Sequence, residues 1–330
     1  MKQIEIPLWR NQISEHKSVQ GLIGSAGENE RISPKDIMPS GRQALSEAIR
    51  LFGLGRHTRV AIPEWSSSCV ISAVGKLATP IPVGDALIYK VPVQAVVIYE
   101  QWGWPRPAAN IEKMLDLIPG AAVILDRADS PHLDAQNFPA LDPARAAEIY
   151  SLSKVLGLDG GGLLRFEGRW AGIKSGERDK DNWDAMMGME DRSLALDLAK
   201  SEIAYLPLPV KEFAEEYNLE NACLEEARVR RANLILMIES PAVEGWNPWM
   251  MDVISTGAAP GIAPLFRGES ETRLEELSSN LAKEFKIETR LYRFDFAADP
   301  ADPEYEMCLA FPIHGMVSPE TFGEVLKRWT

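Results

Sequence analysis

Short apolar runs alternate with segments of helical periodicity over the first half of the chain. Continuous apolar runs of this length are typical of strands buried on both faces of a parallel sheet. Strands are predicted in this way at 59–63, 79–85, 93–100, 121–126 and 149–154, and helices at 44–54, 66–77 and 110–118. Strands that alternate with helices predict an α/β fold with a mostly parallel central sheet.

The pattern changes in the second half of the chain. Residues 183–243 carry long helical periodicity, and opposite charges are predicted to interleave on the exposed face. A strand, a helix, two strands and a closing helix follow this block. We therefore expect a large α/β domain at 1–240, which includes an irregular N-terminal wrap at 1–39 and the helical connection, and a smaller α+β domain at 241–330.

Composition narrows the class of protein. The chain has 330 residues and a formal net charge of −13, which argues against nucleic acid or an anionic membrane as a partner of the whole surface. The three cysteines lack metal-binding or CxxC spacing, so reduced thiols in a cytoplasmic protein are expected. No apolar run approaches the length of a membrane span, no signal peptide is evident, and the four histidines lack zinc-site spacing.

An acid and a lysine follow two neighbouring predicted strands. Asp126 ends the strand formed by Val123, Ile124 and Leu125, and Lys154 comes 28 residues later, after the next strand. Open α/β sheets bind ligands in the crevice outside the carboxyl ends of their strands. A buried carboxylate needs a cationic partner, and a buried lysine can act as an amine nucleophile. The two residues are therefore a candidate reaction centre, although each could be an ordinary surface side chain.

A second candidate is the turn at Ser40, Gly41 and Arg42, which precedes a predicted helix. Backbone N–H groups and the helix dipole at such a turn favour a phosphate, but serine is also a common N-cap without a ligand. The glycine triplet 160–162 allows the backbone to approach a ligand or another chain segment closely, or forms a flexible loop.

A competing motif suggests a different enzyme. Tyr150 and Lys154 form the YxxxK pattern of short-chain dehydrogenases, and residues 21–27 read GLIGSAG. No apolar strand precedes Gly21, and a polar, proline-containing segment follows Gly27 where a dinucleotide-binding turn requires a helix. The dehydrogenase interpretation is therefore the weaker alternative.

Taken in order, the motifs resemble the DegT/StrS-type aminotransferases, which are fold type I pyridoxal-phosphate (PLP) enzymes acting mostly on nucleotide-linked sugars. SGRQAL resembles the phosphate turn of that family, and VVIYEQWGWP resembles its strand ending in Tyr-Gly. VILDRADS is similar to its Asp-x-Ala-Gln strand, SLSKVLGLDGGG to its lysine segment, and CLAFPIHGMVSPETF to its C-terminal stretch. The resemblance covers about residues 38–330. It implies a PLP-dependent aminotransferase, a fold type I large domain and a homodimer.

The resemblance also implies roles for single residues. Lys154 would form the internal aldimine and move the proton, and Asp126 would keep the pyridine nitrogen protonated. Ser40 and the backbone amides of Gly41 and Arg42 would bind the cofactor phosphate.

Further cofactor contacts follow from the same likeness. The Ser151 hydroxyl would also bind the phosphate, and an aromatic ring, for which Trp65 is the candidate, would stack on the pyridine. Asp129 would lie near the ring oxygen of the cofactor.

Three departures from the family pattern keep another function open. Asp129 stands where the family has glutamine or histidine, and an anion there would repel the cofactor phenolate unless it is protonated or points away. Trp65 comes two positions before the expected ring, and the asparagine motif that reaches the partner subunit's phosphate has no clear counterpart. A non-catalytic or regulatory binding protein on the same scaffold is therefore the second hypothesis, beside an aminotransferase that takes an amino acid donor and a keto acceptor.

Overall fold

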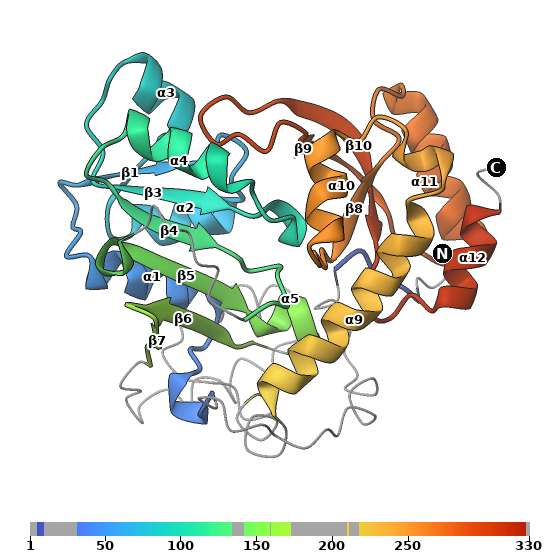
Figure 1. Ribbon diagram of the computed structural model, residues 1–330, viewed down its shortest axis with the longest axis horizontal. Helices are drawn as coiled ribbons and strands as arrows, with labels where there is room; N and C mark the ends of the chain where they lie inside the picture. Colours follow the sequence, from blue (N-terminus) through green and yellow to red (C-terminus); the bar gives the residue numbers. More distant parts are fainter. Residues whose placement is uncertain are drawn as a thin grey trace, which may run out of the picture.

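A seven-stranded, mostly parallel sheet forms the centre of the N-terminal unit in the computed structural model (Figure 1). The structure describes residues 5–9, 32–133, 142–158, 160–172, 210 and 218–327. The strand order is β2-β1-β3-β4-β5-β6-β7, in which β1 to β5 run parallel and β6 and β7 pair antiparallel. The strands are β1 (Arg59–Ile62), β2 (Thr79–Pro82), β3 (Ala95–Tyr99), β4 (Ala122–Asp126), β5 (Ala146–Ser151), β6 (Gly162–Phe166) and β7 (Arg169–Trp170).

Helices cover both faces of this sheet, as the continuous apolar strands predict. Val60 and Ile62 of β1 belong to the apolar cluster beneath α1 and α2, whereas Ala61 belongs to the cluster beneath α3 and α4. The helices are α1 (Gly41–Leu51), α2 (Ser68–Gly75), α3 (Val83–Ile88) and α4 (Ala108–Leu117), with the 3-10 turns η2 (Pro34–Asp36), η3 (Gln101–Gly103) and η4 (Pro143–Arg145). The predicted α/β class is confirmed.

Several of the predicted strands end earlier than expected. The strand expected at 79–85 ends at Pro82, and α3 begins at Val83. The strand expected at 149–154 ends at Ser151, so Lys154 lies in the short helix α5 (Leu152–Leu156). Gly157, with φ +74°, ends α5 in a left-handed conformation that favours glycine.

A long helix, α9 (Leu219–Met237), connects the two units and contacts both α5 and α12 (Figure 1). The prediction that its charges interleave on the exposed face is wrong for one pair. Glu226 and Arg230 are buried and form an i,i+4 ion pair of 2.8 Å between Oε1 and Nε. Their burial follows from the position of α9 between other elements, which sequence periodicity does not reveal.

The C-terminal unit is an antiparallel sheet packed on helices, which confirms the predicted small α+β unit. Its strand order is β8-β10-β9, and its apolar core includes Phe294, Phe311 and Phe322. The elements are η6 (Pro241–Val243), α10 (Pro248–Ser255), β8 (Ile262–Leu265), α11 (Glu271–Glu284), β9 (Arg290–Asp295), β10 (Tyr305–Pro312) and α12 (Pro319–Leu326). No helix in the described ranges is long and apolar enough to cross a membrane.

Residues 5–9, from the predicted N-terminal wrap, lie on this C-terminal unit. Ile6 pairs in parallel with Ile287, and the side chain of Leu8 is completely buried in the C-terminal core. The rest of the wrap up to residue 31, including the 21–27 glycine motif, lies outside the described residues, as does most of 183–217.

Candidate active site

Asp126 and Lys154 lie at the carboxyl-end edge of the sheet. Asp126 is the last residue of β4 and pairs in register with Tyr99 at the end of β3. Its carboxyl is buried, and Oδ1 accepts the backbone N–H of Ala128 at 3.1 Å. Lys154 follows the end of β5, the neighbouring strand, and its side chain keeps one third of its surface exposed. The lysine side chain is therefore partly exposed, next to a buried acid.

The third member of this cluster is Asp129. Its Oδ2 lies 3.0 Å from Nζ of Lys154 and also accepts the Tyr99 hydroxyl at 2.8 Å. The backbone N–H of Trp102 donates to the same tyrosine oxygen at 3.2 Å. Asp129 therefore points toward the lysine and is held there by two hydrogen bonds.

Burial and charge set the protonation of the cluster. Burial raises the pKa of Asp126 to about 6, although the positive charge of Lys154 acts in the opposite direction. Burial lowers the pKa of Lys154, but the carboxylates of Asp129 and Asp126 outweigh that effect and raise it above its ordinary value. Burial and the charge of Asp129 also raise the pKa of Tyr99 well above its usual value. The amine is therefore held protonated until a ligand changes its surroundings.

Arg230 of α9 hydrogen-bonds both to the loop that carries Asp129 and to helix α5, which carries Lys154. Its guanidinium donates to the carbonyl of Asp129 at 2.8 Å and to that of Val155 at 3.4 Å. It is buried to 1% exposure, and its charge is matched by Glu226. Sequence reasoning missed Arg230, and the i,i+4 spacing from Glu226 was the one available signal.

The Ser40 turn lies beside the end of β5. Ser40 caps α1, with its Oγ accepting the N–H of Gln43 at 3.3 Å. A Cβ on Gly41 would lie 3.2 Å from Cβ of Ser151, so glycine allows the helix N-terminus to approach that serine. Ser151 is buried, and its hydroxyl lies 3.0 Å from that of Ser153. The turn and the serine hydroxyl are thus brought together.

The glycine triplet serves a close approach between chain segments. A Cβ on Gly162 would lie 2.2 Å from the carbonyl oxygen of Ser40, and Gly161 pairs with Ser40 across an isolated bridge. The N–H groups of Gly161 and Gly162 donate to the carbonyls of Pro39 and Met38. These contacts fix the turn that opens α1.

Trp65 points toward the C-terminal unit. Its ring is 61% exposed and contacts Tyr305, and the guanidinium of Arg293 lies 5.0 Å from its centroid. The aromatic ring near Lys154 is that of Trp9, whose centroid lies 5.5 Å from Nζ. Sequence reasoning missed Trp9 because residue 9 is remote from the other motifs.

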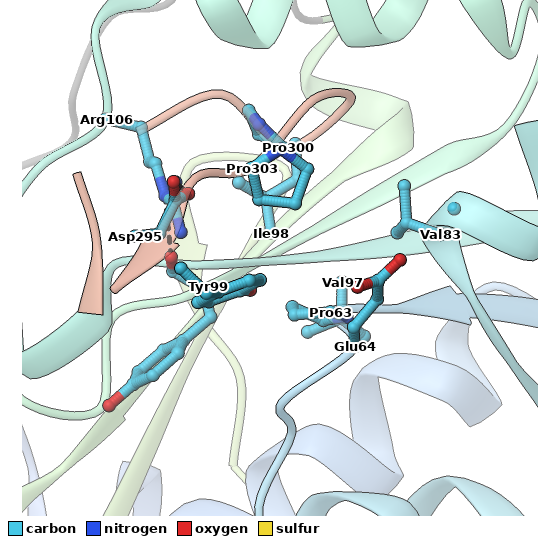
Figure 2. Close-up of a pocket in the computed structure, with 12 residues that line it drawn as sticks. Pro63, Glu64, Val83, Val97, Ile98, Tyr99, Arg106, Asp295, Pro300 and Pro303 are labelled. Atoms are coloured by element: carbon cyan, nitrogen blue, oxygen red, sulfur yellow. Dashed lines mark hydrogen bonds and ion pairs between the residues drawn. The ribbon is translucent and has the colours of Figure 1, made fainter. Parts of the chain in front are cut away.

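A small cavity of about 10 Å³, room for about one water molecule, lies where the two units meet. Figure 2 shows Pro300 and Pro303 of the β9–β10 loop above Ile98, with Arg106 beside Asp295. Arg106 forms a buried ion pair with Asp295 and donates to the carbonyl of Tyr99 at 3.0 Å. The loop therefore fills the crevice beside β1 and β3.

Tyr150 belongs to a separate buried cluster. Its hydroxyl donates to Oε2 of Glu148 at 2.7 Å and accepts from Arg127 at 2.5 Å. Arg127 also pairs with Glu100 at 3.2 Å. Burial raises the pKa of Tyr150 well above its ordinary value, which is the wrong direction for a tyrosine that must give up its proton. The arrangement opposes the dehydrogenase alternative.

Within the described ranges, no three His, Cys, Asp or Glu side chains are placed to hold a metal ion.

Known proteins share this architecture. Residues 30–167 match the model of a family described as "Putative PLP-dependent aminotransferase", and no curated protein matches the chain. A DegT DnrJ EryC1 StrS aminotransferase from Brucella abortus is 15% identical, with a TM-score of 0.55 over 88% of this chain and 83% of that one.

Two further solved structures are similar. S. venezuelae DesV, in complex with a ketimine intermediate, is 16% identical, with a TM-score of 0.50 over 88% of this chain and 82% of that one. A "Putative sugar aminotransferase" from Streptococcus pneumoniae, in its PLP form, is 15% identical, with a TM-score of 0.51 over 89% and 85% of the two chains. The chain thus has the fold of the fold type I PLP enzymes, and its residues 30–167 resemble a family of PLP-dependent aminotransferases.

Proposed function

We propose that this protein is a PLP-dependent aminotransferase that moves an amino group from an amino acid to the keto group of a small molecule. The observation that carries the proposal is the convergence of Asp126 and Lys154 at the carboxyl ends of adjacent strands. The family match over residues 30–167 supports the cofactor, and the sheet topology supports the fold.

The residues present fit the cofactor. Asp126 is a buried carboxylate with a pKa raised to about 6, and a cationic partner such as a pyridinium N–H would stabilise its charge. The helix N-terminus at Gly41 and the hydroxyl of Ser151 lie together and form a phosphate cradle. The partly exposed side chain of Lys154 would supply the amine for the cofactor aldehyde. When bound, PLP supplies an electron sink for the carbon that loses or gains a proton.

The protein side chains supply the remaining chemistry. Asp126 holds the ring-nitrogen proton, and the amine of Lys154, once deprotonated, moves a proton at the reacting carbon. Asp129 lies 3.0 Å from that amine and favours its protonated form. Tyr99 holds Asp129 in place through the hydroxyl hydrogen bond. Arg230 holds the backbone at Asp129 and at Lys154 through hydrogen bonds to their carbonyls.

Absorbance spectroscopy tests the proposal. Purified protein incubated with PLP should turn yellow, and borohydride should bleach the colour and fix the cofactor on Lys154, which peptide mass spectrometry detects. Lys154→Ala should abolish the adduct. Lys113→Ala is the control, because Lys113 also pairs with an aspartate but lies at Asp299. A colourless protein that binds no PLP contradicts the proposal.

A specific contact favours a second candidate, a PLP-binding protein without transaminase activity. The Asp129–Lys154 ion pair keeps the amine protonated, which opposes its reaction with an aldehyde. The two candidates are separated by adding glutamate or another amino donor to the loaded protein. Loss of the yellow colour with release of the keto acid supports the aminotransferase. A spectrum that no donor changes supports the second candidate.

The proposal also covers the keto acceptor of the reaction and the oligomeric state of the protein. The structural neighbours include a sugar aminotransferase, which makes a nucleotide-linked sugar our proposed acceptor. The resemblance of the sequence motifs to the DegT/StrS-type family makes a homodimer the proposed assembly, and three cysteines without metal-binding or CxxC spacing make the cytoplasm its proposed location. Light scattering on the PLP-loaded protein should give twice the mass of 36.6 kDa, and a monomer mass would contradict the dimer.

A further inference from the structure

The ring of Trp9 lies against the amine that the proposed function makes reactive. Its centroid is 5.5 Å from Nζ of Lys154, and the centroid of Tyr99 is 6.0 Å from the same atom. Both distances fall within the range of attraction between an ammonium and an aromatic face. The lysine therefore extends between two rings, one from the sheet and one from the N-terminal segment.

The segment that carries Trp9 is fixed to the C-terminal unit. Glu5 and Ile6 donate backbone hydrogen bonds to the carbonyl of Lys286 at 3.0 and 3.1 Å, and Glu288 donates to the carbonyl of Ile6 at 2.8 Å. The N–H of Leu8 donates to the Glu288 carboxylate at 3.2 Å. The carbonyl of Pro7 lies 3.0 Å from Nε2 of the buried His314.

We propose that Trp9 is a positioning residue for Lys154, through which the C-terminal unit contributes to the reactive centre. The proposal rests on the function proposed for Lys154. The ring has two effects on the lysine. Its face stabilises the ammonium form, and its bulk limits the directions in which the flexible lysine side chain can extend.

Other charged groups face the same amine and must be weighed against the ring. Asp126 and Asp129 favour the ammonium, and Cys69 acts in the same direction when it is ionised. The guanidinium of Arg230 is also near, since it donates to the backbone carbonyls of both Asp129 and Lys154. Substitution of Trp9 leaves all of these groups in place. A change in the unprotonated fraction of Lys154 therefore measures the contribution of the ring.

Competitive labelling of the cofactor-free protein tests the proposal. The rate at which acetic anhydride modifies Lys154 measures its unprotonated fraction, and peptide mass spectrometry reads that rate residue by residue. Trp9→Leu keeps apolar bulk but removes the aromatic face, so Lys154 should react about threefold faster over the pH range in which it is mostly protonated. Trp9→Phe keeps a ring face and should stay within about twofold of the wild type.

Trp170→Leu is the matched control, because Trp170 contacts Arg165 and Tyr150 and should leave the Lys154 rate unchanged. Equal Lys154 rates in the wild type and Trp9→Leu overturn the proposal, as does equal acceleration in the Leu and Phe variants. Since no cofactor is present, the result stands even when the protein fails to bind PLP, which is the failure of the proposed function.

Fluorescence gives an independent measurement that remains available when Trp9→Leu does not fold. PLP added to the wild type should quench Trp9 emission, so Trp9→Phe should lose a larger part of the quenched signal than Trp170→Phe, whose ring lies at Arg165. If PLP binds and the quenched signal is the same in wild type and Trp9→Phe, Trp9 does not lie at the reactive centre.

Discussion

Asp129 is the residue whose chemistry most affects the candidate site. A carboxylate at this position could point away from the ligand, and the structure instead shows it 3.0 Å from Lys154 and hydrogen-bonded to Tyr99. Its charge raises the pKa of the lysine. The proton of that amine must leave before it can attack an aldehyde, and Asp129 makes this step harder.

Substitution of Asp129 by asparagine should therefore favour the reaction with PLP. The amide removes the negative charge and keeps a hydrogen-bond acceptor for Tyr99. We expect cofactor attachment at pH 7 to become about tenfold faster, because an opposite charge at this distance strongly favours the protonated amine. Stopped-flow absorbance measures the rate, with Asp299→Asn, which removes the partner of Lys113, as the control. A slower rate in Asp129→Asn would show that the carboxylate assists the reaction as a proton acceptor.

Asp126 should make the cofactor-free protein less stable as pH rises. Its folded-state pKa of about 6 lies above the ordinary value of 3.8, so the neutral carboxyl is the form that favours folding. The cost of the charge develops between about pH 4 and 6 and is complete above that range, at roughly 3 kcal/mol. Urea denaturation should show that Asp126→Asn is more stable than the wild type at pH 8 and similar to it at pH 4. An unchanged difference across this range would contradict the assignment.

Sequence reasoning located Asp126, Lys154 and the Ser40 turn because each follows from a strand or helix boundary. It did not locate Trp9 or Arg230. Trp9 reaches the site through pairing with residues 286–288, and Arg230 reaches it through the packing of α9. Such contacts between distant parts of the chain leave no local pattern. For the same reason, the contact of Trp65 with the C-terminal unit could not be read from its motif.

The buried Glu226–Arg230 pair of α9 stabilises the contact between the Asp129 loop and helix α5. Arg230→Met removes the hydrogen bonds to the loop carbonyls and leaves Glu226 buried without its counterion. Removing one partner of a buried pair costs about 3–5 kcal/mol. Denaturant titration should show this loss, while Arg228→Met, on the same helix but exposed with Glu225, should change stability by less than about 0.5 kcal/mol. Similar effects of the two variants would count against a structural role for the buried pair.

Helix and strand identities in the large unit were the most predictable features. The apolar runs that form β3 and β4 are buried on both faces, so they could be recognised without knowledge of their neighbours. Boundaries were less predictable, as the early end of β5 at Ser151 shows. The placement of Lys154 on a separate helical turn depends on Gly157 and on packing against α9, which act after the strand has ended.

Across the whole molecule, the buried Arg106–Asp295 pair joins the two units. Gln101 adds to this junction, since its side chain donates to the carbonyl of Arg293 at 2.7 Å and accepts the N–H of Asp295 at 3.1 Å. Arg106→Met leaves Asp295 buried without its counterion, at a cost of about 3 kcal/mol or more. Calorimetry should then resolve the single transition expected for the wild type into two, the C-terminal unit melting first. A single transition at the wild-type temperature would show that the junction does not depend on this pair.

The pairing of residues 5–9 with the C-terminal unit also has a consequence during synthesis on the ribosome. Leu8 bonds to Glu288 across a separation of 280 positions. At typical elongation rates, residues 5–9 must wait roughly 15 to 60 seconds after their own synthesis for the segment that contains Glu288. Until then the apolar Leu8 and Trp9 have no C-terminal core to enter, although the sheet that carries Asp126 and Lys154 can already form. The contact between Trp9 and Lys154 is therefore completed only after Glu288 has been made.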